Sequence, residues 1–123
     1  MTKRVVVADA DAAEATLLGR WIAEGGDEPV LLDAADNLLG LIAELRPDLM
    51  VLDIDFGGPF VGLLLGAVVK TLYGLSVTYV LPRRRITRED MARIPGSSIL
   101  FRPVGRIPLR FWIALARKRD ATR

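Results

Sequence analysis

The chain has 123 residues, a formal net charge of +2, and neither Cys nor His. This length suits one domain that buries its own apolar core, so we expect a single domain over residues 1–123. The composition excludes disulfides, zinc–thiolate sites, thiol nucleophiles and imidazole bases. Only Met1–Arg4 precede the first apolar run, too short a lead for a signal peptide, and we expect a cytoplasmic protein.

The first elements are predicted from apolar runs and helix-capping signals. Residues 5–8 form a β-branched run that is typical of a strand covered on both faces. Asp11, with Glu14 three residues later, fits the capping pattern of a helix that ends at Gly25. Residues 29–32 then predict a short second strand.

The rest of the chain continues the alternation of helix and strand. Asp33 is expected to cap a helix that stops before Pro47. The remaining expected elements are, in chain order, a strand over 49–54, a helix over 60–72, a strand over 77–81, a short helix over 87–93, a strand over 98–101 and a helix with Pro108 in its first turn that runs to about Arg119. Five strands that alternate with helices predict an α/β fold with a parallel sheet.

The expected helix over 60–72 is apolar around its whole circumference, although a surface helix should be polar on its outer side. Gly58, Gly62 and Gly66 recur every four residues and would form a smooth stripe. Close packing on the sheet and self-association both explain such a stripe. Because some of the bulky residues must face outward, we expect a homodimer through this helix, with Leu63, Leu64 and Val68 as the main candidates.

The same apolar stretch does not predict a membrane span. A spanning helix needs about 20 continuous apolar residues. Pro59, Lys70 and Gly74 divide this stretch into a helix and a strand. We therefore expect no membrane segment.

Two of the predicted strands lead into a carboxylate. Asp9 follows the first strand, and Asp53 lies at the end of the third. Either one alone could be an ordinary turn residue. In open α/β sheets, however, ligands bind at the carboxyl ends of the strands, and two neighbouring strands would bring both acids into one pocket.

The order of elements and four landmarks resemble the receiver domain of two-component response regulators. The landmarks are Asp9, the run Pro47–Ile54 that carries Asp53, the Gly-rich loop after it, and the segment Phe101-Arg102-Pro103-Val104. The resemblance covers essentially the whole chain and implies a flavodoxin-like (CheY-like) fold with a five-stranded parallel sheet. It also implies that Asp53 is the position phosphorylated by a histidine kinase and that Asp9 helps to hold Mg²⁺.

Several positions depart from the family pattern. Ala8 replaces the first acid of the metal-binding pair, and Leu81 replaces the Ser or Thr that binds the phosphoryl group. Arg102 takes the place of a Lys, and Ile99 takes that of the aromatic switch residue. Asp55 lies where the family uses a backbone carbonyl as metal ligand, so its carboxylate offers a replacement charge.

These departures predict an atypical receiver with no catalytic activity, in which Arg102 pairs permanently with Asp53. Phosphoryl transfer relies on positioning and charge neutralisation, and the missing metal ligand and hydroxyl remove much of both. The alternative is a working phospho-acceptor in which Asp9, Asp53 and Asp55 bind Mg²⁺. In the first case no cofactor is expected.

Charge is divided along the chain. Residues 1–60 hold 4 Lys or Arg and 12 Asp or Glu, whereas residues 61–123 hold 13 and 3. A signalling protein with an acidic surface would complement the basic half, although solvated helix ends also explain it. The candidate partner face comprises Arg83, Arg84, Arg85, Arg88, Arg106 and Arg110. A basic nucleic-acid-binding module is a second alternative, disfavoured because Phe111 and Trp112 are expected to be buried and not free to stack on bases.

Overall fold

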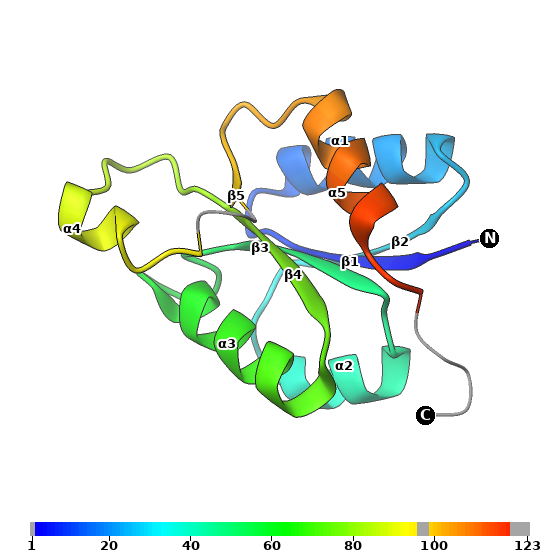
Figure 1. Ribbon diagram of the computed structural model, residues 1–123, viewed down its shortest axis with the longest axis horizontal. Helices are drawn as coiled ribbons and strands as arrows, with labels where there is room; N and C mark the ends of the chain where they lie inside the picture. The colour runs from blue at the N-terminus through cyan, green and yellow to red at the C-terminus, as the bar shows by residue number, and fades with distance from the viewer. Residues whose placement is uncertain (1, 96–98, 119–123) are drawn as a thin grey trace.

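The computed structural model describes residues 2–95 and 99–118, which form one parallel sheet between two layers of helices (Figure 1). The sheet order is β2-β1-β3-β4-β5. The strands are β1 (Arg4–Ala8), β2 (Glu28–Leu32), β3 (Leu49–Asp53), β4 (Ser76–Val80) and β5 (Ile99–Leu100). The helices are α1 (Ala12–Glu24), α2 (Leu38–Leu45), α3 (Val61–Tyr73), α4 (Arg88–Met91) and α5 (Arg106–Leu115). The predicted α/β, flavodoxin-like architecture is confirmed.

Alternating side chains of the central strands build two apolar layers. Val5 and Val7 of β1 pack with α1 and α5 on one face, whereas Val6 packs with α2 and α3 on the other. Leu49 and Met50 of β3 divide between the two layers in the same way. Burial on both faces explains why these strands are continuously apolar rather than alternating.

Of the two predicted helix caps, one is confirmed and the other is wrong. Asp11 caps α1 as predicted, since its Oδ1 accepts a hydrogen bond of 3.1 Å from the Glu14 amide. The prediction for Asp33 is wrong, because α2 begins only at Leu38, after Asn37 in a left-handed conformation. Residues 33–37 lack the large apolar side chains that α2 buries from Leu38 onward, so the helix starts where packing begins.

The C-terminal elements are shorter than predicted. Helix α5 contains Pro108 in its first turn, as expected, but it ends at Leu115. The chain becomes extended at Ala116, whose side chain is buried in the core. Strand β5 covers only Ile99–Leu100, and the part of the predicted strand at Ser98 lies outside the described residues.

The glycine stripe of α3 faces the sheet. A Cβ atom at Gly62 would collide with the carbonyl oxygen of Asp53, and one at Gly66 would collide with the phenol of Tyr79. Close packing on the sheet therefore explains the stripe. With the glycines inward, Leu64 is 67 % exposed. Leu63, another candidate for the dimer contact, is partly buried against the core.

The outer side of α3 carries a row of apolar side chains. Leu64, Val68 and Leu72 are exposed and spaced by four residues, so they lie on one side of the helix. We call these three residues the α3 face. Among the described residues, no helix has the length and apolar character needed to cross a membrane.

Candidate functional site

Asp9 and Asp53 lie side by side at the carboxyl end of the sheet. Strands β1 and β3 are neighbours, with Ala8 opposite Leu52, so the residues that follow converge as predicted. Each carboxylate is oriented by the backbone amide two residues later. Asp9 Oδ1 accepts 2.9 Å from the Asp11 amide, and Asp53 Oδ1 accepts 2.8 Å from the Asp55 amide. In both residues, Oδ2 is left for a further partner.

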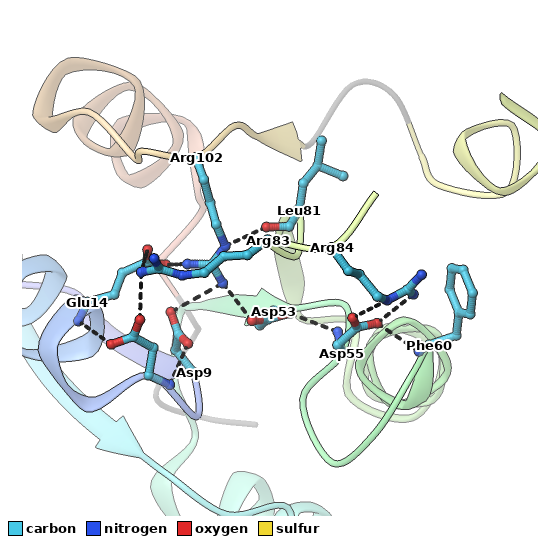
Figure 2. A network of polar contacts seen from close by, with 10 residues as sticks. Asp9, Glu14, Asp53, Asp55, Phe60, Leu81, Arg83, Arg84 and Arg102 are labelled. Atoms are coloured by element: carbon cyan, nitrogen blue, oxygen red, sulfur yellow. Dashed lines mark hydrogen bonds and ion pairs between the residues drawn. The ribbon is translucent and has the colours of Figure 1, made fainter. Parts of the chain in front are cut away.

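That partner is the guanidinium of Arg102, which comes from the loop after β5 (Figure 2). Arg102 Nη2 lies 2.6 Å from Asp53 Oδ2 and 3.7 Å from Asp9 Oδ2. Its Nε donates a 2.6 Å hydrogen bond to the Leu81 carbonyl oxygen, and its Nη1 forms an ion pair with Glu14. The predicted pairing of Arg102 with Asp53 is confirmed.

Three nearly buried carboxylates therefore share one cation. The side chains of Asp9, Glu14, Asp53 and Arg102 are 3 %, 10 %, 13 % and 12 % exposed. Burial, together with the neighbouring Glu14 carboxylate, raises the pKa of Asp9 to about 6. Burial also raises the pKa of Asp53, against the opposing effects of the Asp55 amide and Arg102.

A second arginine binds Asp55. Arg84 donates through Nε and Nη2 to the two carboxylate oxygens of Asp55, at 2.6 and 2.9 Å. The guanidinium also lies over the Phe60 ring, 4.6 Å from its centroid, and the Phe60 amide donates to Asp55 Oδ1 at 3.0 Å. The hydrogen bonds from Arg84 are the main reason that the pKa of Asp55 is lowered.

A third arginine completes the site. Arg83 Nη2 forms an ion pair with Asp11 Oδ2 at 2.6 Å, and the Arg83 side chain is 70 % exposed. Our prediction grouped Arg83 and Arg84 with a partner face, and the structure instead pairs both with carboxylates of the same chain.

The arrangement does not fit a magnesium site of the kind that the family resemblance implies. Ala8 is packed in the core and supplies no oxygen ligand. The carboxylate of Asp55 is turned to Arg84, and the guanidinium of Arg102 lies against both Asp53 and Asp9. Among the described residues, no group of three or more acidic side chains is arranged to hold a metal ion.

The two positions at which the family carries a hydroxyl and an aromatic switch residue are apolar and partly buried here. Leu81 and Ile99 both pack against the core layer of α2 and α3, so their side chains supply no polar group to the site. Leu81 contributes its carbonyl oxygen instead, as the acceptor for Arg102.

Sequence reasoning missed Glu14 as a member of the site. Its position three residues after Asp11 was fully explained by helix capping, so nothing indicated a second role. In the structure its amide completes the cap and its carboxylate pairs with Arg102. The first turn of α1 thus carries a third acid to the strand ends.

The remaining arginines of the predicted partner face fall into two groups. Arg88 begins α4 and Arg85 lies in the loop before it, whereas Arg106 and Arg110 lie on α5, well apart from α4 (Figure 1). The expected burial of Phe111 is wrong, because its side chain is 56 % exposed on α5. Trp112 is partly buried against the core.

Truncating Arg102 should destabilise the domain strongly. Arg102→Ala leaves three nearly buried carboxylates without their cation, and we expect a loss of about 3 kcal/mol or more at pH 7. Arg83→Ala is the matched control, since it removes an exposed ion pair and should cost less than about 1 kcal/mol. Urea unfolding measures both, and equal losses would contradict the role given to Arg102.

Asp9 should make stability depend on pH. Because its pKa is about 6 in the folded domain and 3.8 in the reference state, the folded protein retains this proton between pH 4 and 6 after the unfolded chain has released it. The contribution of Asp9 to the free energy of unfolding is therefore fully present below pH 4 and is lost as the pH rises through 6. Asp9→Asn should therefore match the wild type near pH 4 and exceed it by about 3 kcal/mol at pH 7.

Asp11→Asn provides a control of opposite sign. The Glu14 amide and Arg83 lower the pKa of Asp11, so this variant should lose stability relative to the wild type as pH rises from 3 to 5. Because Asn also caps helices, the variant and the wild type differ mainly in the charge at position 11. Parallel pH profiles for the two variants would refute the assignment of the raised pKa to Asp9.

Comparisons with known proteins give structural matches only. No protein-family model and no curated protein matches the sequence. Solved structures match over nearly the whole chain. The signal receiver domain of a modulated diguanylate cyclase from Desulfovibrio desulfuricans G20 superposes with a TM-score of 0.80 at 19 % identity, covering 94 % of both chains.

Two further structures agree with this match. A CheY-like response regulator receiver domain protein from Methanospirillum hungatei JF-1 has a TM-score of 0.75 at 20 % identity, covering 93 % of this chain and 92 % of that one. The receiver domain of a DNA-binding response regulator from Colwellia psychrerythraea 34H has a TM-score of 0.76 at 15 % identity, covering 91 % and 95 %. The chain therefore has the fold of a CheY-like response regulator receiver domain.

Proposed function

We propose that this domain is an atypical receiver that acts through protein–protein contacts, without catalysis and without switching by phosphorylation of Asp53. The observation that carries the proposal is the position of the Arg102 guanidinium, 2.6 Å from Asp53 and 3.7 Å from Asp9. A receiver that accepts phosphate needs an accessible carboxylate oxygen and a counter-charge that is free to meet the incoming group.

Both oxygens of Asp53 already have partners. Oδ1 accepts from the Asp55 amide, and Oδ2 accepts from Arg102. The Leu81 side chain cannot hydrogen-bond a phosphoryl oxygen. Formation of an acyl phosphate at Asp53 would have to break a nearly buried ion pair, with little in the site to stabilise the product.

The same arginine supports a single fixed state of the surface. Its hydrogen bond to the Leu81 carbonyl and its ion pair with Asp53 join the loops after β4 and β5 to the end of β3. These contacts of Arg102 take the place of those that a phosphoryl group on Asp53 would otherwise make. A surface of constant shape suits a partner that binds regardless of phosphorylation.

The isolated domain should not accept stable phosphate from a small phosphodonor in Mg²⁺. Intact-mass spectrometry should show no adduct of one phosphoryl group on the wild type. Restoring the missing groups in Ala8→Asp/Leu81→Thr/Arg102→Lys should give a metal-dependent adduct, and the same variant with Asp53→Asn is its negative control. Substantial phosphorylation of wild-type Asp53 would favour a working phospho-acceptor instead.

The partner that we propose is a signalling protein with an acidic surface. Arg85, Arg88, Arg106 and Arg110 are exposed, and no ion pair within the described residues involves any of them. Arginine provides planar, weakly hydrated donors that suit carboxylates at interfaces. These four residues therefore keep the partner role that the charge pattern predicts.

We also propose homodimerisation through the α3 face. Leu64 and Leu72 are 67 % and 60 % exposed, and the only charged residue of α3 is Lys70, which lies over the Tyr79 ring. A two-fold contact between two such uncharged faces therefore brings no like charges of α3 together.

Sedimentation velocity at micromolar concentration should show a dimer. Leu64→Ser/Leu72→Ser should shift the domain to monomer, because it removes most of the apolar area of the α3 face. Leu31→Ser is the control, since Leu31 is also exposed but lies on β2. A wild type that stays monomeric at every concentration, or a dimer unaffected by the double substitution, would exclude this interface.

A further inference from the structure

A cavity of about 260 Å³ lies beside the first residues of β4, where α3 and α5 approach the sheet from opposite faces (Figure 1). It is remote from the carboxylates around Arg102. Strand β4 begins at Ser76 beside the cavity and leads at its other end to Leu81, whose carbonyl oxygen accepts from Arg102. We call this space the β4 cavity. Its polar lining residues are Lys70, Ser76, Thr78 and Trp112.

Lys70 brings a positive charge to the β4 cavity without an acidic partner. Its Nζ lies over the Tyr79 ring, 5.0 Å from the centroid, and Lys70 takes part in no ion pair within the described residues. No residue that lines the cavity is acidic. Partial burial lowers the pKa of Lys70, because it removes water from the ammonium group. An anion in the cavity would compensate for that lost hydration.

Two further hydrogen-bond donors line the β4 cavity. Alternation along β4 places Thr78 on the α5 side of the sheet, the same side as Val80. Thr78 is only 1 % exposed, and its hydroxyl makes no hydrogen bond within the described part of the chain. The indole N–H of Trp112 has no acceptor there either. Because buried polar groups are normally hydrogen-bonded, an oxygen anion in the cavity would satisfy donors that the chain itself leaves unpaired.

The remaining wall and the size of the β4 cavity limit what it can hold. Leu49, Leu75 and Leu115 line it with apolar atoms. Its volume is just below the range of about 300–1,000 Å³ that is typical of sites for drug-sized ligands, so a single ring or a short branched chain fits it. One ammonium group and neutral donors match a single negative charge, whereas a doubly charged phosphate is usually bound by more than one cation.

We propose that the β4 cavity binds a small organic acid, with its carboxylate at Lys70 and Thr78 and its apolar body against the leucines of the wall. The combination of an unpaired cation, an unpaired buried hydroxyl and an apolar wall in one cavity carries this inference. The inference goes beyond the proposed function and does not depend on it, because the cavity contains none of the residues around Asp53.

Two probes of the same shape, 4-methylbenzoate and 4-methylbenzamide, test the proposal on the wild-type chain. In a ¹H–¹⁵N NMR titration, the benzoate should saturate shifts of the lining residues and of the Trp112 indole N–H. A Kd of about 1 mM is expected for a ligand of about ten non-hydrogen atoms. The benzamide should bind about tenfold more weakly, because it lacks the charge. The indole N–H of Trp21, the other tryptophan, lies outside the cavity and should not shift.

Substitutions then assign the binding to individual groups. Lys70→Met keeps the length of the side chain without its charge and should weaken benzoate binding by about tenfold. Thr78→Val keeps the shape without the hydroxyl and should weaken it by about fivefold. Lys118→Met is the matched control, since it removes an exposed lysine that does not line the cavity and should change the Kd by less than about twofold.

Four results would overturn the proposal. They are no saturable binding of the benzoate, equal binding of the two probes, undiminished binding by Lys70→Met, or displacement of the benzoate by an equal concentration of inorganic phosphate. Both substitutions in the cavity replace polar groups that have no hydrogen-bond or ion-pair partner in the described part of the chain, so the variants should fold, and a thermal melt checks this. The comparison of the two probes needs no variant and stands by itself.

Discussion

The arrangement of the carboxyl end of the sheet depends on one guanidinium in a nearly buried position. Arg102 reaches Asp53 on β3, Glu14 on α1 and the Leu81 carbonyl after β4, so it joins three parts of the chain to the loop after β5. A planar guanidinium can serve several acceptors at fixed angles, which a compact ammonium group cannot do as well. One cation does not neutralise three carboxylates, however, and burial together with the neighbouring Glu14 carboxylate raises the pKa of Asp9 to about 6.

The division of charge along the sequence has a structural counterpart at this site. The ion pairs around it all join an acid from the first sixty residues to an arginine from the second half. They are Asp11 and Glu14 with Arg83, Asp55 with Arg84, and Asp9, Glu14 and Asp53 with Arg102. Part of the charge polarity therefore holds the domain together. Of the predicted partner face, Arg85, Arg88, Arg106 and Arg110 are exposed and take part in no ion pair within the described residues.

The parts of the site that follow from sheet geometry were predictable from sequence. Parallel strands bring their carboxyl ends to one edge, so the meeting of Asp9 and Asp53 required only that β1 and β3 be neighbours. The role of Arg102 was predicted from the resemblance to receiver domains, which have a cation after the last strand. Which side of a helix faces the sheet was harder to predict. Helix α3 is apolar around its whole circumference, so its sequence did not reveal that Leu63 lies toward the core and Leu64 toward solvent. Phe111 was likewise assigned to the core because α5 was expected to bury its aromatic residues, and Glu14 was hidden behind its helix-capping role.

The tight fit of Gly62 against the Asp53 carbonyl couples the position of helix α3 to that of the acid cluster. The backbone of α3 contacts the end of β3 without an intervening side chain, and the Leu63 amide hydrogen-bonds the Ile54 carbonyl at 3.2 Å. The acid cluster and the α3 helix are therefore in mechanical contact, since neither backbone can shift without displacing the other. In the dimer that we propose, any event that moves Asp53, such as loss of its arginine, would change the free energy of association through α3. By thermodynamic reciprocity, association would change the free energy of that event by the same amount.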